Sequence, residues 1–171
     1  MHLEIERKFL IKMPSHSLLL SQNGCSCDKI EQTYLKSEKG VSARVRARYS
    51  DVKCEYTKTE KRRLSPLTCE ENERVITKKE YNELLLLRQE NLRTIEKHRY
   101  AFPYQNRVIE IDVYPFWSDV ATLEIELEDE REEISLPDFI ELVCEVTHDV
   151  RFKNRALAEK IPDISEFLPQ K

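Results

Sequence analysis

Apolar and polar residues alternate along much of this chain of 171 residues. In the first such segment Leu3, Ile5 and Phe9 fall on one side together with Arg7, and Lys8 falls on the other side. Because successive side chains of a β-strand point to opposite faces, a period of two predicts strands with one apolar face. The pattern predicts eight strands, over residues 3–11, 29–36, 41–49, 53–59, 71–76, 91–100, 107–114 and 122–128.

Helices are predicted in three places. Thr77 and Glu80 have the spacing of a capping box, and a run of leucines follows them. This predicts a helix over residues 77–88 that covers one face of the sheet. Two further helices are expected over 136–142 and 152–160, around a short extended stretch at 144–147. The segments 14–24 and 60–66 are predicted to be loops.

The order of these elements favours an α+β fold in a single domain over residues 1–171. Most of the predicted strands are joined by short connections, which suit antiparallel pairing, whereas parallel strands need long crossover segments. An antiparallel sheet or barrel with helices packed outside it is therefore favoured.

Composition narrows the class of protein. The chain has 28 Lys and Arg against 32 Asp and Glu, so its net charge of −4 does not favour nucleic acid. No stretch approaches the roughly 20 apolar residues that cross a bilayer. The charged N-terminal segment lacks the apolar core of a secretory signal, and the five cysteines are an odd number. We therefore expect a cytoplasmic protein with reduced thiols and no membrane partner.

Charged side chains recur in pairs two positions apart on the predicted strands. The acidic pairs are Glu4 with Glu6, Glu71 with Glu73, Glu110 with Asp112, and Glu124 with Glu126, and the basic pairs are Arg44 with Arg46 and Lys97 with Arg99. The members of a pair share a strand face and lie about 6.6 Å apart. A single pair is typical of the solvated face of a sheet. Acidic pairs on some strands and basic pairs on others favour a closed barrel that brings both kinds together.

A barrel interior lined with charge of both signs is stable only when ions are bound there. Arg and Lys neutralise phosphate oxygens, while carboxylates hold Mg²⁺ or Mn²⁺. The pattern therefore predicts a site for a polyanion held together with a hard divalent cation. P-loop, acyl-transfer and zincin mechanisms have no support, because the sequence lacks a Gly-rich phosphate loop, a nucleophile elbow and an HExxH helix.

These residues resemble the motifs of a known group of proteins. Glu4-Ile5-Glu6-Arg7-Lys8 resembles the N-terminal ExExK motif of the CYTH, or triphosphate tunnel metalloenzyme, superfamily, and Arg44-Val45-Arg46 resembles its RxR strand. The similarity continues in order through Lys58, Glu71-Asn72-Glu73, Lys97-His98-Arg99-Tyr100, Glu110-Ile111-Asp112, Glu124-Ile125-Glu126, and Glu145-Val146-Thr147 with Arg151 and Asn154. It covers essentially the whole chain and is greatest to small bacterial inorganic tripolyphosphatases.

The resemblance implies an eight-stranded antiparallel β-barrel, the triphosphate tunnel, with helices packed outside it. Its substrate-binding side chains would be Lys8, Arg44, Arg46, Lys58, Lys97 and Arg99. Its Mg²⁺ or Mn²⁺ would be held by Glu4, Glu6, Glu124 and Glu126, with Glu71, Glu73 and Asp112 as further acidic lining. The catalytic residues would be Lys8, Glu6 and Glu126, and the resemblance is compatible with a homodimer.

We therefore predict a metal-dependent phosphohydrolase that removes the terminal phosphate of a triphosphate, with inorganic tripolyphosphate as its main substrate. Three alternatives stay open at this point: a class IV-type adenylate cyclase, a thiamine or nucleoside triphosphatase, and a non-catalytic polyphosphate-binding module. A cyclase needs a pocket for the nucleotide base, and no such pocket is identified. A binding module needs the basic residues but not the acidic ones.

Overall fold

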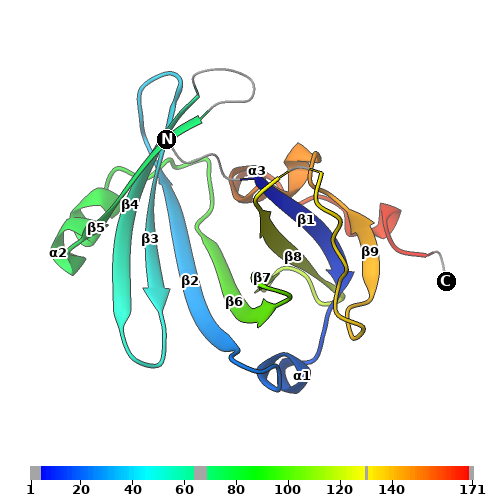
Figure 1. Ribbon diagram of the computed structural model, residues 1–171. Helices are drawn as coiled ribbons and strands as arrows, with labels where there is room; N and C mark the ends of the chain where they lie inside the picture. The colour runs from blue at the N-terminus through cyan, green and yellow to red at the C-terminus, as the bar shows by residue number, and fades with distance from the viewer. Residues whose placement is uncertain (1–4, 64–68, 130, 170–171) are drawn as a thin grey trace.

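The computed structural model describes residues 5–63, 69–129 and 131–169 (Figure 1). These residues form one antiparallel sheet with the strand order β5-β4-β3-β2-β6-β7-β8-β1-β9. The strands are β1 (Ile5–Lys12), β2 (Ser26–Leu35), β3 (Val41–Tyr49), β4 (Cys54–Arg63), β5 (Cys69–Ile76), β6 (Ile95–Tyr104), β7 (Arg107–Val113), β8 (Val120–Leu127) and β9 (Leu142–Glu145). The α+β class and the antiparallel pairing are confirmed, and each predicted strand is present with somewhat different bounds.

The prediction of a closed eight-stranded barrel is wrong. The sheet of the described residues has nine strands and two free edges, at β5 and β9. Closure would require β5 to pair with the free edge of β1, but β9 occupies that edge, with Phe9 opposite Glu145 and Ile11 opposite Leu142. Figure 1 shows that the sheet is instead strongly curved, with β4 and β5 on one side of the molecule and β1 and β9 on the other. The curvature gives the sheet a concave and a convex face.

The helices differ from the prediction at three places. The leucine-rich helix α2 (Lys78–Leu85) is confirmed, and the hydroxyl of Thr77 accepts a hydrogen bond from the backbone N–H of Glu80 at 3.1 Å. The helix predicted over residues 152–160 is represented by a 3₁₀ turn, η1 (Val150–Phe152), and α3 (Asn154–Glu159), and a second 3₁₀ turn, η2 (Ile164–Glu166), follows. A short helix that was not predicted, α1 (His16–Leu20), lies in the segment expected to be a loop.

No helix forms over the predicted range 136–142. A single turn is closed there by a hydrogen bond from the Ile140 N–H to the Pro137 carbonyl, and β9 then begins at Leu142. Leu136, Phe139 and Ile140 pack on the convex face of the sheet. The apolar spacing in this segment therefore arises from contact with the sheet and not from a helix.

Three apolar clusters stabilise the sheet and leave part of its concave face polar. Two lie on the convex face: one is centred on Phe9, Tyr100 and Leu123, and the other lies under α2 around Val45 and Tyr81. The third cluster covers one end of the concave face, where Tyr114, Trp117, Phe152 and Leu157 pack beneath α3. Burial of each such side chain contributes about 1.5–3 kcal/mol. The remaining concave surface is available for charged side chains.

Two other sequence expectations can be compared with the structure. Cys25, Cys27, Cys54 and Cys144 are free thiols, as predicted for these four residues. Among the described residues, no helix has the length and apolar composition needed to cross a membrane.

Candidate functional site

Strand register determines which charged side chains reach the concave face. Residues directly opposite each other in neighbouring strands share a face, which links Lys8 to Glu124, Glu124 to Glu110, and Gln32 to Arg46. The charged residues on the concave face include Glu6, Lys8, Asp28, Arg44, Arg46, Arg48, Lys61, Glu71, Glu73, Lys97, Arg99, Glu110, Asp112, Glu124 and Glu126. These include all the predicted site residues except Lys58 and Glu4. Glu4 lies outside the described residues.

Lys58 lies on the opposite face of the sheet from the other predicted basic residues. It is directly opposite Val45, a residue of the convex cluster under α2, and it forms an ion pair with Glu60 at 2.7 Å. Lys61 occupies the concave face instead and pairs with Glu71 at 2.5 Å. The predicted strand ended at Thr59, whereas β4 continues to Arg63. Continuing the alternation by two positions beyond Thr59 would have identified Lys61.

At the centre of the concave face, Asp112 holds two cations. Its carboxylate accepts a hydrogen bond from Lys97 Nζ at 2.5 Å and two from the Arg99 guanidinium, each at 2.7 Å. Lys97 and Asp112 are only 1% and 0% exposed. Burial alone raises the pKa of Asp112, but Lys97 and Arg99 outweigh it and hold that pKa well below its usual range. Asp112 is therefore ionised and neutralised by its two partners.

Glu124 continues the same network on β8. It pairs with Lys8 Nζ at 2.6 Å and with Arg99 at 3.0 Å, and the Lys8 ammonium also donates to the Phe152 carbonyl oxygen at 3.0 Å. Burial raises the pKa of Glu124, but the charges of Lys8, Lys97 and Arg99 outweigh it, so the net shift is downward. Arg99 also pairs with Glu110. Each of the three cations Lys8, Lys97 and Arg99 therefore already has a carboxylate partner.

Five carboxylates line one cavity of about 1300 Å³, those of Glu6, Glu110, Glu124, Glu126 and Glu128. Four of them form two pairs of directly opposite glutamates, Glu6 with Glu126 and Glu110 with Glu124. Burial, together with the negative charges of Asp112 and Glu124, raises the pKa of Glu110 against the opposing charge of Arg99. Like charges directly opposite each other on neighbouring strands are destabilising unless a cation lies near them.

The oxygen-rich set on this cavity fits a hard divalent cation in its chemistry. Within the part of the chain that the structure describes, however, no three Asp, Glu, His or Cys side chains are already gathered as a metal cage. The carboxylates line a common space without forming a closed coordination sphere.

Two basic residues of β3, Arg44 and Arg46, are less completely neutralised than Lys8, Lys97 and Arg99. Arg46 donates hydrogen bonds from Nε and Nη2 to the neutral side-chain oxygen of Gln32, at 3.3 and 3.2 Å, and has no ion pair among the described residues. Burial, with the positive charges of Arg44 and Arg99, lowers the pKa of Arg46 to about 10. Arg44 lies 3.6 Å from one Glu71 oxygen, while Lys61 pairs with the other, and the buried Nε of Arg44 has no hydrogen-bond partner among the described residues.

Residues at the margins of this surface have other partners. Arg48, the third arginine of β3, pairs with the buried Asp28 at 2.6 Å and is 42% exposed. The Thr59 hydroxyl donates to Glu73 at 2.7 Å. Arg151 pairs with Asp149 and Glu166, and the Asn154 oxygen accepts a hydrogen bond from the Tyr114 hydroxyl at 3.0 Å. Arg151 and Asn154 therefore stabilise the C-terminal segment and its contact with the sheet.

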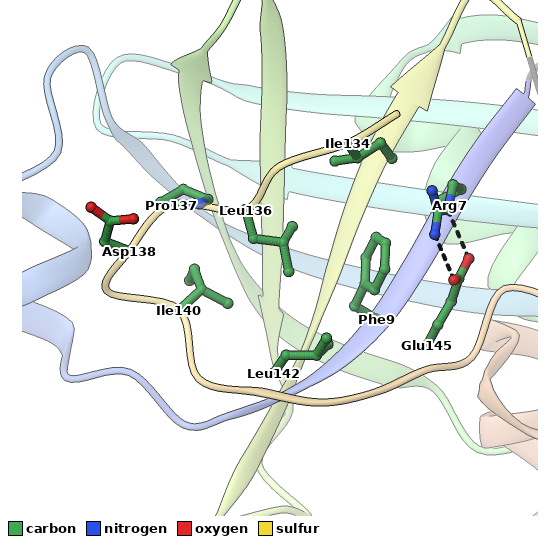
Figure 2. A pocket seen from close by; sticks show the side chains of 9 residues that line it. All are labelled: Arg7, Phe9, Ile134, Leu136, Pro137, Asp138, Ile140, Leu142 and Glu145. Atoms are coloured by element: carbon green, nitrogen blue, oxygen red, sulfur yellow. Dashed lines mark hydrogen bonds and ion pairs between the residues drawn. The ribbon is translucent and has the colours of Figure 1, made fainter. Parts of the chain in front are cut away.

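A second, smaller cavity of about 480 Å³ lies on the convex face, between β1 and the segment 134–142 (Figure 2). Its surface is largely apolar, with Phe9, Leu136 and Ile140 among its lining residues. Figure 2 shows the Arg7 guanidinium directed at the Glu145 carboxylate, with hydrogen bonds of 2.8 and 2.6 Å. Because Glu145 neutralises Arg7, this cavity offers no uncommitted positive charge, and the concave face is the better candidate for an anion site.

Comparison with solved structures gives relatives of the same architecture. The chain is similar to the inorganic triphosphatase NE1496, with a TM-score of 0.61 and 28% identity over 95% of this chain and 99% of that chain. It is also similar to PH1819 protein from Pyrococcus horikoshii OT3, with a TM-score of 0.52 and 17% identity over 74% of this chain and 80% of that chain. A proposed adenylate cyclase from Bacillus halodurans has a TM-score of 0.50 and 17% identity, over 75% of this chain and 82% of that chain.

The last two likenesses show the fold alone. No family model matches the chain, and no curated protein matches it in sequence. The likeness to NE1496 extends over nearly the full length of both chains, and it coincides with an ordered series of acidic and basic pairs on one sheet face. These findings are consistent with the CYTH, or triphosphate tunnel metalloenzyme, superfamily, whose motifs the sequence resembles.

Proposed function

We propose that this chain is a metal-dependent phosphohydrolase that cleaves the terminal phosphate from inorganic tripolyphosphate. The observation that supports this most strongly is that Arg46 has no ion pair among the described residues, while its neighbour Arg44 on the concave face has only a long contact of 3.6 Å to Glu71. Like charges held together in a partly buried place are unfavourable until an anion joins them. A further unsatisfied group lies beside them, because the buried hydroxyl of Thr57, directly opposite Arg46, has no hydrogen-bond partner among the described residues.

The charge and shape of these groups favour a phosphate chain over other anions. A planar guanidinium presents N–H groups as a fork that matches two phosphate oxygens. Two such forks two positions apart on one strand can contact oxygens of neighbouring phosphates, since they lie about 6.6 Å apart. The similar protein NE1496 is an inorganic triphosphatase, which supports the same class of substrate.

The acidic cavity between β1, β7 and β8 supports a role for Mg²⁺ or Mn²⁺. Glu6, Glu124 and Glu126 would hold the ion, with Glu110 close to them and Glu4 as a further candidate from the resemblance. When bound, such an ion lowers the pKa of water and withdraws charge from phosphate oxygens. Glu124 forms ion pairs with Lys8 and Arg99. Binding of a divalent ion by the Glu124 oxygens would weaken these ion pairs and make the two cations more available to the substrate.

The side chains of this chain have separate roles in the reaction. A water oxygen forms a bond to the terminal phosphorus while the bond to the bridging oxygen breaks, and the products are orthophosphate and pyrophosphate. Glu6 and Glu126 are exposed on the cavity and can accept the proton of the water. Lys8 donates from Nζ to two oxygens, so we assign it to stabilising developing negative charge and not to proton removal.

The test is a substrate panel with purified protein, in which tripolyphosphate, ATP and thiamine triphosphate are each supplied with Mg²⁺ and then with Mn²⁺. Products are resolved by ion-exchange chromatography. We expect tripolyphosphate to yield pyrophosphate and orthophosphate fastest, and ATP to yield ADP more slowly, because every side chain assigned to the site suits phosphate or metal and none is assigned to a nucleoside. Cyclic AMP and pyrophosphate formed from ATP would replace this proposal with a cyclase.

A further inference from the structure

We propose that Gln32 is a positioning residue that holds Arg46 in place for the substrate without neutralising its charge. This inference rests on the proposed function and identifies how that site keeps its affinity for anions. Gln32 lies on β2 directly opposite Arg46 and is 0% exposed. Its side-chain oxygen accepts hydrogen bonds from both Nε and Nη2 of Arg46.

Tyr34 determines which end of the amide faces the arginine. The Gln32 nitrogen donates to the Tyr34 hydroxyl at 2.9 Å, and Tyr34 is itself only 5% exposed beneath the Arg155 guanidinium, which lies 5.4 Å from the ring centre. An amide has one donor end and one acceptor end of nearly equal shape. If it were reversed, the NH₂ group would face the N–H groups of Arg46. Tyr34 and Arg46 together therefore fix Gln32 with its oxygen toward the arginine.

The neighbouring Arg48 shows what a carboxylate does to an arginine of this strand, although Asp28 lies diagonally across from Arg48 and Ile30 is directly opposite it. On the same two strands Asp28 pairs with Arg48 at 2.6 Å and neutralises it. Hydrogen bonds between ions are shorter and about twice as strong as neutral ones. A carboxylate at position 32 would therefore compete with phosphate for Arg46, whereas the amide supplies orientation and leaves the positive charge available.

The test compares binding and kinetics in Gln32→Glu, which keeps the shape of the side chain and adds one negative charge. Affinity for tripolyphosphate is measured by calorimetry without divalent metal, and KM and kcat are measured with Mg²⁺. We expect Kd and KM to rise about tenfold or more, with a smaller change in kcat, because ionic bonds to Arg46 must be broken before phosphate binds. The melting temperature should not fall, since an ion pair replaces a neutral contact.

A double-mutant cycle shows whether the effect acts through Arg46. In the background Arg46→Gln, the change Gln32→Glu should add less than a twofold effect, because its target is absent. If Gln32→Glu does not fold, Tyr34→Phe carries the test: it removes only the hydroxyl, and we expect Kd to rise about threefold as the amide loses its fixed orientation.

The outcomes separate this inference from the proposed function. If the wild-type protein neither binds nor hydrolyses tripolyphosphate, the proposed function fails. If the wild-type protein does both and Gln32→Glu binds equally well, or binds less well to the same extent in the Arg46→Gln background, the positioning role of Gln32 is contradicted.

Discussion

The concave face contains two regions that carry the same kinds of basic residue but differ in how these are neutralised. In the region formed by β6, β7, β8 and β1, the cations Lys8, Lys97 and Arg99 are all paired with Asp112, Glu110 or Glu124. In the β3 region, the hydrogen bonds of the Arg46 side chain to other described residues go only to the neutral Gln32. The β3 region is therefore ready to bind an anion, while the other region must first exchange its internal ion pairs.

This difference suggests a division of labour. A buried cation without a partner is costly, and complete neutralisation would remove the affinity for phosphate. The concave face contains both kinds of cation. Lys8, Lys97 and Arg99 are paired with carboxylates and stabilise the fold, whereas Arg46 keeps an available charge at some cost in stability. The predictions below test this contrast in order of expected effect.

The largest effect is expected for Asp112→Asn. Removing its charge leaves Lys97 buried without an ionic partner and weakens the contact with Arg99, which should lower the free energy of unfolding by about 3–5 kcal/mol at pH 7. Denaturant unfolding measures this, with Asp28→Asn as the matched control, because Arg48 is far more exposed and the loss should be smaller.

The same variant gives a pH prediction. The pKa of Asp112 is depressed in the folded state, so its contribution to stability is present above the unfolded pKa of about 3.9 and is lost as pH falls toward the folded pKa. The difference between wild type and Asp112→Asn should therefore be constant near neutrality and shrink below about pH 4. A difference that is small at pH 7 would contradict the structural role of the paired region.

The second prediction concerns the carboxylates of the cavity. Glu6→Gln and Glu126→Gln preserve shape and remove charge, and each should reduce turnover at least tenfold, equivalent to about 1.4 kcal/mol in transition-state stabilisation. Both residues are exposed, so the melting temperature should change little. Glu96→Gln, on the exposed convex side of β6, is the control and should keep full activity. Full activity in both cavity variants would remove them from the catalytic assignment.

The third prediction tests the forked contacts of the β3 region. Arg46→Lys retains charge but replaces the guanidinium with an ammonium, so KM for tripolyphosphate should rise about threefold to tenfold. Arg48→Lys should have a smaller effect, because Arg48 is partly exposed and already paired with Asp28. Equal tolerance of lysine at Arg44, Arg46 and Arg48 would indicate that the row contacts only solvent.

The smallest effect is expected at the edge of the sheet, where strand register separates two lysines. Lys61→Ala should raise KM by up to about threefold, since Lys61 lies on the concave face but is partly exposed. Lys58→Ala should leave KM unchanged, because Lys58 lies on the convex face near α2. Steady-state kinetics of the two variants decide between the two faces, and the reverse order of effects would contradict the register.

The sequence predicts those parts of this fold that depend on local pattern. Alternation of charged and apolar residues identifies the strands and their polar face, and the Thr77–Glu80 spacing identifies α2. Closure of the sheet was predicted incorrectly, because it depends on a contact between distant segments: β9, from residue 142 onward, takes the edge of β1. Its few residues carry no periodic signal that indicates which edge they join.

The candidate site shows the same limit. The pairs Arg44 with Arg46 and Glu124 with Glu126 follow from alternation and lie on the expected face. Lys58 was included because the motif resemblance implied it, and Lys61 was missed because the predicted strand ended at Thr59, before the true end of β4. The partners of each cation could not be predicted, since Gln32 and Asp28 both lie on β2 and only the three-dimensional register assigns them to different arginines.

The central claim is that the β3 arginines bind a phosphate chain before any metal engages the paired region. The most direct measurement is isothermal titration calorimetry of tripolyphosphate into the metal-free protein, for wild type and for the double variant Arg44→Gln with Arg46→Gln. We predict measurable binding by the wild type, weakened at least tenfold in the double variant while Lys97→Gln, if folded, has a smaller effect. Binding that is unchanged in the double variant, or that is absent from the metal-free wild type, would contradict the account.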